Sequence, residues 1–212
     1  MCRISPLLEE QIADSPWKLL VVVTLLNKTA GTLAIPAFWR ILARWPTPLD
    51  LSKADEEELV STIRHLGTQT IRAKRLIALS RSYIREPPSA YDLRPSKRPS
   101  LSSSNRRGSR FFDSSKNTKN ISYPATPISH LPGAGPYALD SYRIFCTTHD
   151  DPTCEEWKVV MPTDKELIRY LKWKWAFFET LEWSPTKGPT DTITVSYLTK
   201  LFVELEDNKL ST

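Results

Sequence analysis

The chain has 212 residues, 40% of them hydrophobic, so it can bury one sizeable core in one or two lobes, and its net charge of +5 is compatible with a polyanionic partner without identifying one. Its three cysteines, Cys2, Cys146 and Cys154, are too few for a disulfide framework and cannot supply the four thiolates of an iron–sulfur cluster. The most apolar run, 19–26, is too short to cross a bilayer, so we expect a soluble intracellular protein with no membrane association.

Helical patterns fill the first part of the chain, from about residue 7 to residue 84. Ser15 followed by Pro16 predicts a helix start, with Ser15 as the N-cap and Pro16 in the first turn. Apolar residues then recur at helical spacing as far as Leu26, and they are dense enough to predict a central, buried helix.

Two glycines divide the helices that follow. Gly31 precedes a predicted helix over 35–45, and a further helix is predicted over 52–63. Gly67 separates that helix from another over 71–84, because glycine in a helix interior is unfavourable.

The composition changes between residues 85 and 122, where Ser, Pro and Arg dominate, as in RPSKRPSLSSSNRRGSR. Such a segment has too few apolar residues to offset its ordering entropy, so we predict a disordered insert. Its arginines could attract DNA nonspecifically or serve as a nuclear import patch, and a plain flexible loop is the simpler alternative.

Helical patterns return near residue 127 and include a predicted helix over 162–183. The C-terminal extension, 184–212, contains apolar residues spaced as in an amphipathic helix between Tyr197 and Leu205. Strand signals are nearly absent. We therefore expect an all-α fold and one domain over 1–212.

The segment LPGAGPY, Leu131 to Tyr137, places a Gly-x-Gly turn before a helix in a chain that has six glycines. Gly133 and Gly135 allow a positive φ and a close approach to a ligand, and the N–H groups at the start of the next helix can bind an anion. This pattern predicts a phosphate-binding hairpin. A simple helix–helix turn with glycine at a C-cap is the alternative.

Four blocks of sequence occur together and in order: SPWKLLVVVTLLNKTAGTLAIPAFW (15–39), LGTQTIRAKRL (66–76), LPGAGPYALDSYRIFC (131–146) and WKVVMPTD (157–164). Together they resemble the helix–hairpin–helix DNA glycosylases of the endonuclease III superfamily, and most closely the glycosylase domain of the methyl-CpG-binding thymine DNA glycosylases.

The resemblance implies a two-lobed all-α fold, interrupted by the disordered insert, with a DNA cleft between the lobes. It further implies a nuclear base excision repair enzyme that acts on double-stranded DNA containing a mismatched or damaged base. We expect a monomer. We expect no methyl-CpG-binding module before the first helix, so targeting to methylated sites would need another protein or another part of a longer gene product.

Two aspartates compete for the catalytic role. Asp140 follows the hairpin closely and would pair with Arg143 three residues later on its helix. The family's catalytic aspartate lies further on, at the start of the next long helix, which the resemblance places at Asp164. The alternative is purely structural: Thr163-x-x-Glu166 is a capping-box pattern, which would make Asp164 a first-turn carboxylate.

The resemblance also implies a base pocket formed by Tyr137 and Glu9. Tyr137 stands where bifunctional relatives carry a Schiff-base lysine, so we expect a monofunctional glycosylase without lyase activity. Lys165, beside Asp164, is a poor substitute nucleophile because neighbouring helical residues face apart. The family has glutamine where this chain has Glu9, and an ionised carboxylate only accepts hydrogen bonds, so the base preference is open.

At two of the positions where the resemblance implies DNA contacts, this chain has a different residue from the family. Lys28 replaces an arginine that fills the space of the flipped base, and Thr68 replaces a leucine wedge. For both, a solvated surface position is the alternative, as it is for the basic residues near Thr68, among them Arg75. The full set of expected DNA contacts is Gly133, Gly135, Lys28, Thr68, Gln69, Arg72 and Lys74.

The expected reaction is hydrolysis of the N-glycosidic bond of thymine or uracil mispaired with guanine. Two alternatives remain: a noncatalytic helix–hairpin–helix DNA-binding module, and a glycosylase for another damaged pyrimidine. The three histidines show no metal-binding spacing, so no metal or other cofactor is expected. By family analogy, a monovalent cation could bridge the hairpin carbonyls and a phosphate.

Overall fold

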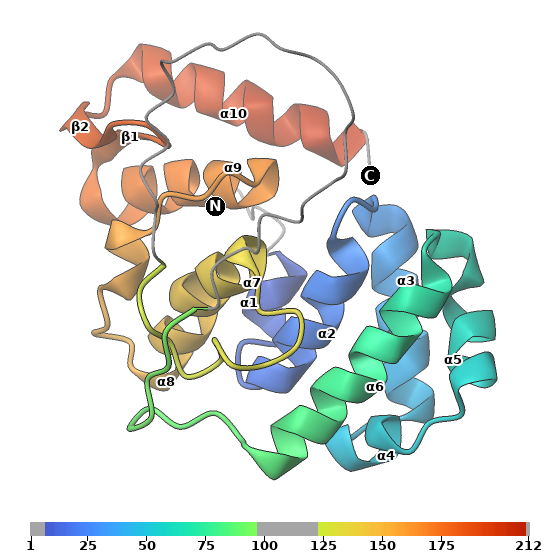
Figure 1. The fold of residues 1–212 in the computed structure, drawn as a ribbon. Helices are drawn as coiled ribbons and strands as arrows, with labels where there is room; N and C mark the ends of the chain where they lie inside the picture. The colour runs from blue at the N-terminus through green and yellow to red at the C-terminus, as the bar shows by residue number, and fades with distance from the viewer. Residues whose placement is uncertain (1–6, 97–122, 211–212) are drawn as a thin grey trace, which may run out of the picture.

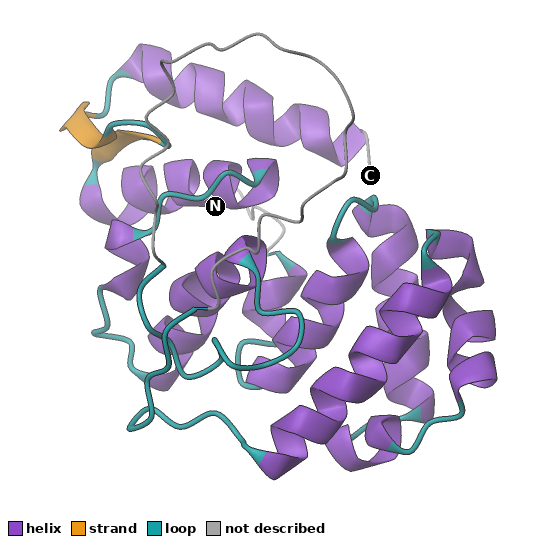
Figure 2. Cartoon of the chain, viewed as in Figure 1, coloured by secondary structure: helices purple, strands orange, loops and turns teal. Residues whose placement is uncertain are grey.

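The structure, a computed structural model, describes residues 7–96 and 123–210, with side chains as far as residue 206. The described residues form an all-α fold in two lobes, with one small antiparallel strand pair (Figures 1 and 2). The first lobe holds α2 (Pro16–Leu26), α3 (Gly31–Arg44), α4 (Pro48–Ser52), α5 (Glu56–Ile63), the 3-10 turn η1 (Arg64–Leu66) and α6 (Gln69–Arg85).

The second lobe begins with α7 (Pro136–Ser141), which continues as one helical run through the π-helical segment η2 (Tyr142–Cys146) into α8 (Thr147–Asp150). The short helix α1 (Leu8–Gln11) packs beside this run (Figure 1). The remaining elements are η3 (Glu156–Val159), α9 (Lys165–Lys174), η4 (Trp175–Glu179), β1 (Leu181–Ser184), β2 (Gly188–Thr192) and α10 (Val195–Leu210).

The first lobe is built around α2, as its apolar sequence predicts. The predicted start is confirmed: Pro16 begins the helix, and the Ser15 hydroxyl accepts a hydrogen bond from the N–H of Lys18 at 3.4 Å. Buried residues occupy nearly every position from Trp17 to Leu25. The Trp17 indole donates to Ser80 Oγ at 3.0 Å, which ties α2 to α6 across the core.

The described part of the predicted insert is held in place. Helix α6 ends at Arg85, and the loop after it pairs with the chain that follows the insert, through two backbone hydrogen bonds between Arg94 and Thr126. The Arg94 guanidinium also bonds Glu86 and Asp92. Residues 86–96 are therefore ordered, whereas the sequence predicted disorder there. The prediction rested on the small number of apolar residues and did not include the contacts made by charged pairs.

The C-terminal part departs from the predicted single helix over 162–183. Helix α9 ends at Lys174 and η4 at Glu179, after which Thr180 adopts a left-handed conformation with φ 55°. The chain then forms the β1–β2 hairpin, which no strand signal predicted. The predicted amphipathic helix of the extension is present as α10, and it lies over α9, where Glu204 accepts two hydrogen bonds from Lys172.

No helix within the described ranges, 7–96 and 123–210, has the length and apolar character needed to cross a membrane.

Candidate active site

A cavity of about 900 Å³ is lined by residues of both lobes. The first lobe contributes the end of α2, the turn before α3 and Arg75 of α6, while the second contributes the hairpin and the start of α9. Helix α1 closes the cavity with Leu8 and Glu9. Six of the sequence-predicted site residues line this one cavity: Glu9, Lys28, Gly133, Gly135, Tyr137 and Asp164.

Asp164 begins α9 as its N-cap, one position earlier in the helix than the capping-box pattern predicts. Its Oδ1 accepts hydrogen bonds from the N–H groups of Glu166 at 2.9 Å and Leu167 at 3.1 Å. Among the described residues, none donates a hydrogen bond to Oδ2. The Asp164 side chain is half-buried and lines the cavity, so its Oδ2 remains available at the cavity wall. Its position at a helix N-terminus is one where negative charge is favourable.

Tyr137 and Glu9 meet inside the cavity although they are 128 positions apart. The Tyr137 hydroxyl donates to Glu9 Oε1 at 2.6 Å, and the Glu9 side chain is almost fully buried. Burial and the Glu9 carboxyl raise the pKa of the Tyr137 hydroxyl well above its usual value, so the hydroxyl stays protonated. This pair forms a polar end to a pocket whose other walls include Val23 and Ile35.

The two glycines of the hairpin have different structural roles. Gly133 has φ 93°, a backbone conformation that side chains with a Cβ rarely adopt, so the position favours glycine. A Cβ there would make ordinary van der Waals contacts, 3.4 Å from Thr24 Oγ1 and 3.5 Å from Arg75 Cδ. Gly135 caps α7 with an ordinary negative φ, and its N–H donates to Gly133 O at 2.8 Å. In the described chain, the N–H groups of Tyr137 and Ala138 donate to no other residue and remain free for an anion.

Two exposed side chains at the edge of the first lobe have unusual backbone conformations. Lys28, in the turn between α2 and α3, has φ 58°, and Thr68, before α6, has φ 48°. Left-handed conformations are strained for non-glycine residues, and for a β-branched threonine they are rare. These are the positions that the resemblance assigns to the contacts that fill and wedge the duplex. Lys28 lines the cavity, whereas Thr68 and its neighbour Gln69 do not.

Arg72 does not extend to the surface as a phosphate contact would require. Its guanidinium is buried and donates to Leu25 O at 3.0 Å, Asn27 O at 2.8 Å and Thr29 Oγ1 at 2.7 Å. It therefore ties the start of α6 to the turn that carries Lys28. No sequence signal indicated this role, because the acceptors lie more than 40 positions earlier in the chain.

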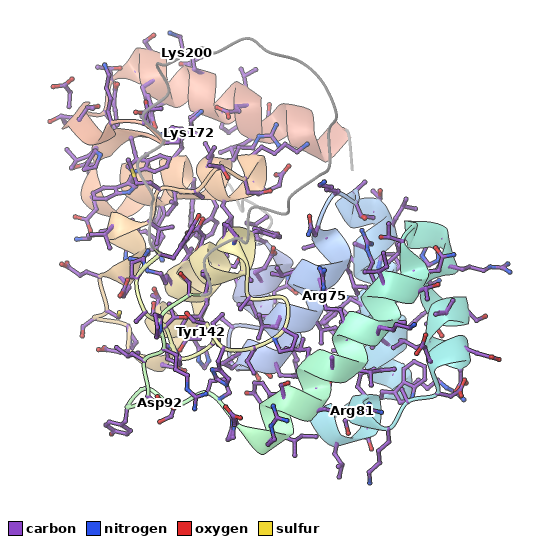
Figure 3. All side chains as sticks on the ribbon, in the orientation of Figure 1. Arg75, Arg81, Asp92, Tyr142, Lys172 and Lys200 are labelled. Carbon is purple, nitrogen blue, oxygen red and sulfur yellow. The ribbon has the colours of Figure 1, made fainter. Side chains whose placement is uncertain are left out.

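The other basic residues of α6 lie on different sides of the helix. Lys74 is exposed and pairs with Glu56 at 3.7 Å, away from the cavity. Arg75 is exposed and lines the cavity beside Gly133, so it is better placed for an anion than either Arg72 or Lys74. Figure 3 labels Arg75 on α6, well apart from Arg81 near α4.

Asp140 is not part of the cavity wall. The predicted pairing with Arg143 is wrong, because the Arg143 guanidinium bonds Glu156 through two nitrogens, each 2.8 Å from the same oxygen. Asp140 is buried behind the hairpin, and burial raises its pKa to about 6, with Arg143 acting in the opposite direction. Of the two competing aspartates, only Asp164 lines the cavity.

Residues 21–186 match the model of the HhH-GPD superfamily base excision DNA repair proteins. This match covers most of the chain, including the hairpin and Asp164, and it begins after the α1 residues that line the cavity.

Three curated proteins are similar to parts of the chain. A methyl-CpG-binding domain protein 4-like protein of Arabidopsis thaliana is 26% identical over 164 residues, which are 77% of this chain and 27% of that protein. A thymine-DNA glycosylase of Aeropyrum pernix is 39% identical over 66 residues, 31% of this chain and 30% of that protein. A thymine/uracil-DNA glycosylase of Pyrobaculum aerophilum is 36% identical over 73 residues, 34% of this chain and 32% of that protein. Each match thus covers less than a third of the relative's own length.

Proposed function

Since the chain belongs to the HhH-GPD superfamily of base excision DNA repair proteins, we propose that it is a monofunctional DNA glycosylase that removes thymine or uracil mispaired with guanine. The observation that carries this proposal is the position of Asp164 in the wall of the cavity that also contains Tyr137 and Glu9. The names of two of the relatives, a thymine-DNA glycosylase and a thymine/uracil-DNA glycosylase, support the choice of base.

Asp164 acts on the sugar of the extruded nucleotide. Bond cleavage builds positive charge on the sugar ring, and a carboxylate nearby stabilises that charge and orients the attacking water. The hydrogen bonds to Oδ1 fix the side chain on the first turn of α9, while Oδ2 remains available. Because the position is held before the substrate arrives, little reorganisation is needed during the reaction.

The absence of lyase activity follows from the side chain at position 137. An imine with the opened sugar requires an amine, and the Tyr137 hydroxyl cannot form one. Two lysines, Lys28 and Lys165, line the same cavity. Lys165 is 78% exposed, and its Nζ lies 3.7 Å from Glu166 Oε1, so it lies at the surface beside a carboxylate and is poorly placed to act as the nucleophile.

The DNA lies across the mouth of the cavity, between the two lobes. The N–H groups at the start of α7 and the Arg75 guanidinium hold phosphates, and Lys28 and Thr68 enter the duplex where the base has left. Both side chains are exposed at the edge of the first lobe. The monovalent cation at the hairpin, the monomeric state and the nuclear location stay predictions.

An excision assay on labelled duplexes tests the proposal. Purified protein is incubated with duplexes containing G·T, G·U or an oxidised pyrimidine, and abasic sites are then cleaved with alkali. We expect strand breaks from G·T and G·U only after alkali, and far slower formation of these breaks with Asp164→Asn. Breaks before alkali would show a lyase, breaks only at oxidised pyrimidines would change the substrate, and binding without breaks would indicate a noncatalytic DNA-binding module.

A further inference from the structure

Glu9 has an environment that an ordinary carboxylate avoids. It lies on α1, its side chain is 3% exposed, and it lines the cavity that contains Asp164. Its Oε1 accepts the short hydrogen bond from Tyr137 at 2.6 Å. A buried carboxylate is normally paired with a cation, and Glu9 forms no ion pair within the described chain.

The charges around Glu9 favour its neutral form. Burial raises its pKa above 4.5, the carboxylates Asp164 and Glu166 of α9 raise it further, and the Tyr137 hydrogen bond lowers it without reversing the shift. The cations Lys28, Arg75 and Lys165 line the same cavity, but in the described chain none of them forms an ion pair with Glu9. Glu10, the neighbour on α1, faces another partner, the Tyr170 hydroxyl at 3.1 Å.

We propose that Glu9 takes part in catalysis as a neutral carboxylic acid, whose Oε2–H donates a hydrogen bond to a carbonyl oxygen of the extruded base. The pocket then selects pyrimidines that present carbonyl oxygens, the class to which uracil and thymine belong. This inference rests on the proposed glycosylase function and names the chemical group that its base pocket reads.

The hydrogen-bonding capacity of the two forms explains the selection. A neutral carboxyl offers one donor and one acceptor side by side, as a glutamine amide does. Oε1 accepts from Tyr137 and keeps a second lone pair for the N–H that lies beside a carbonyl in uracil and thymine. An ionised Glu9 would place two acceptors against that carbonyl, and an unpaired buried acceptor is costly. A protonated Glu9 therefore supplies the donor that an ionised carboxylate lacks.

The test compares the pH profiles of single-turnover uracil excision from G·U duplexes for the natural protein and Glu9→Gln. The natural protein should lose activity as the pH rises through the pKa of Glu9, about tenfold for each pH unit above that pKa, and we call this decrease the alkaline loss. Glu9→Gln should remain active without this alkaline loss, because an amide donates at every pH. Tyr137→Phe removes the hydrogen bond that lowers the pKa of Glu9, so any remaining alkaline loss should move to higher pH.

Glu10→Gln is the matched control, because it removes a neighbouring carboxyl that does not line the cavity, and its profile should follow that of the natural protein. Two results would overturn the inference while the proposed function stands. In the first, Glu9→Gln loses excision at every pH, which would mean that the ionised carboxylate is required. In the second, Glu9→Gln keeps the same alkaline loss, which would show that a group other than Glu9 causes that loss.

Failure of the natural protein to excise any base would reject the proposed function, and a second measurement would still test the state of Glu9. The folded state disfavours ionised Glu9. The measured quantity is the unfolding free energy of the natural protein minus that of Glu9→Gln, and this difference should be highest below pH 4.5. It should fall as the pH rises from there through the pKa of Glu9 in the folded protein. A difference that does not change with pH would show that Glu9 is not held neutral.

Discussion

Arg72 allows a test of whether one buried guanidinium positions both Lys28 and Thr68, the two residues that are expected to enter the duplex. It stands four residues after Thr68 on α6, and its three hydrogen bonds hold the turn that contains Lys28. We consider Arg72→Met, which keeps an apolar stem of similar length and removes every donor. The turn would lose its link to α6, and the strained conformations at both positions could relax.

The size of the effect follows from the burial of the three acceptors. The bond to Leu25 O is buried, and leaving that carbonyl unpaired costs about 2 kcal/mol. The bonds to Asn27 O and Thr29 Oγ1 are partly exposed, so water replaces them in part and each contributes about 0.5–1 kcal/mol. We therefore expect the unfolding free energy to fall by about 3 kcal/mol, a large share of the total of about 5–15 kcal/mol for a typical protein.

Chemical denaturation measures this loss, and excision from two substrates separates positioning from stability. Under conditions where the variant is folded, Arg72→Met should excise uracil much more slowly from a G·U duplex, because extrusion depends on Lys28 and Thr68. Excision from single-stranded DNA, which requires no extrusion from a duplex, should change far less.

Arg81→Met is the matched control. Arg81 lies on the same helix and donates one partly buried hydrogen bond to Ser52 O at 3.0 Å, away from the cavity. It should cost about 1 kcal/mol and leave the duplex to single-strand ratio unchanged. If Arg72→Met also leaves that ratio unchanged, Arg72 stabilises the fold without positioning the two residues.

Three further predictions concern the catalytic and hairpin residues. Asp164→Asn should keep the melting temperature, because asparagine caps helices as well as aspartate, and should slow single-turnover excision by about 10²–10⁴; near-normal turnover would remove Asp164 from the active site. Gly133→Ala should lose about 1–2 kcal/mol of stability and weaken DNA binding measured by anisotropy at fixed salt, because its φ is 93°. Gly135→Ala, whose Cβ would meet nothing within 4 Å, should be much milder, and equal effects would contradict this assignment. Borohydride treatment during turnover should trap no covalent DNA adduct, and an adduct would refute the monofunctional mechanism.

Local sequence signals were sufficient to predict much of the helical architecture. The start of α2 at Pro16 with a Ser15 cap, the break at Gly67 and the amphipathic α10 depend on interactions within a few residues of the chain. The same holds for Gly133, because a positive φ at a tight turn is a property of the backbone at that position.

Signals failed where partners distant in sequence decide the conformation. The helix predicted over 162–183 ends early, and the chain after Thr180 forms the β1–β2 hairpin, in which Trp183 is buried. Order over 86–96 depends on the pairing of Arg94 with Thr126. These contacts lie outside the short windows on which helix and disorder patterns depend.

The sequence by itself determined the helical class, the hairpin and the family resemblance that singled out Asp164, Tyr137 and Glu9. Only the tertiary structure decided which charged groups line the cavity: it brought Glu9 against Tyr137, buried Arg72 and Asp140, and left Arg75 exposed beside the hairpin. The physical reason is that charge state and accessibility depend on burial and on neighbours in space, and both are set when the two lobes pack together.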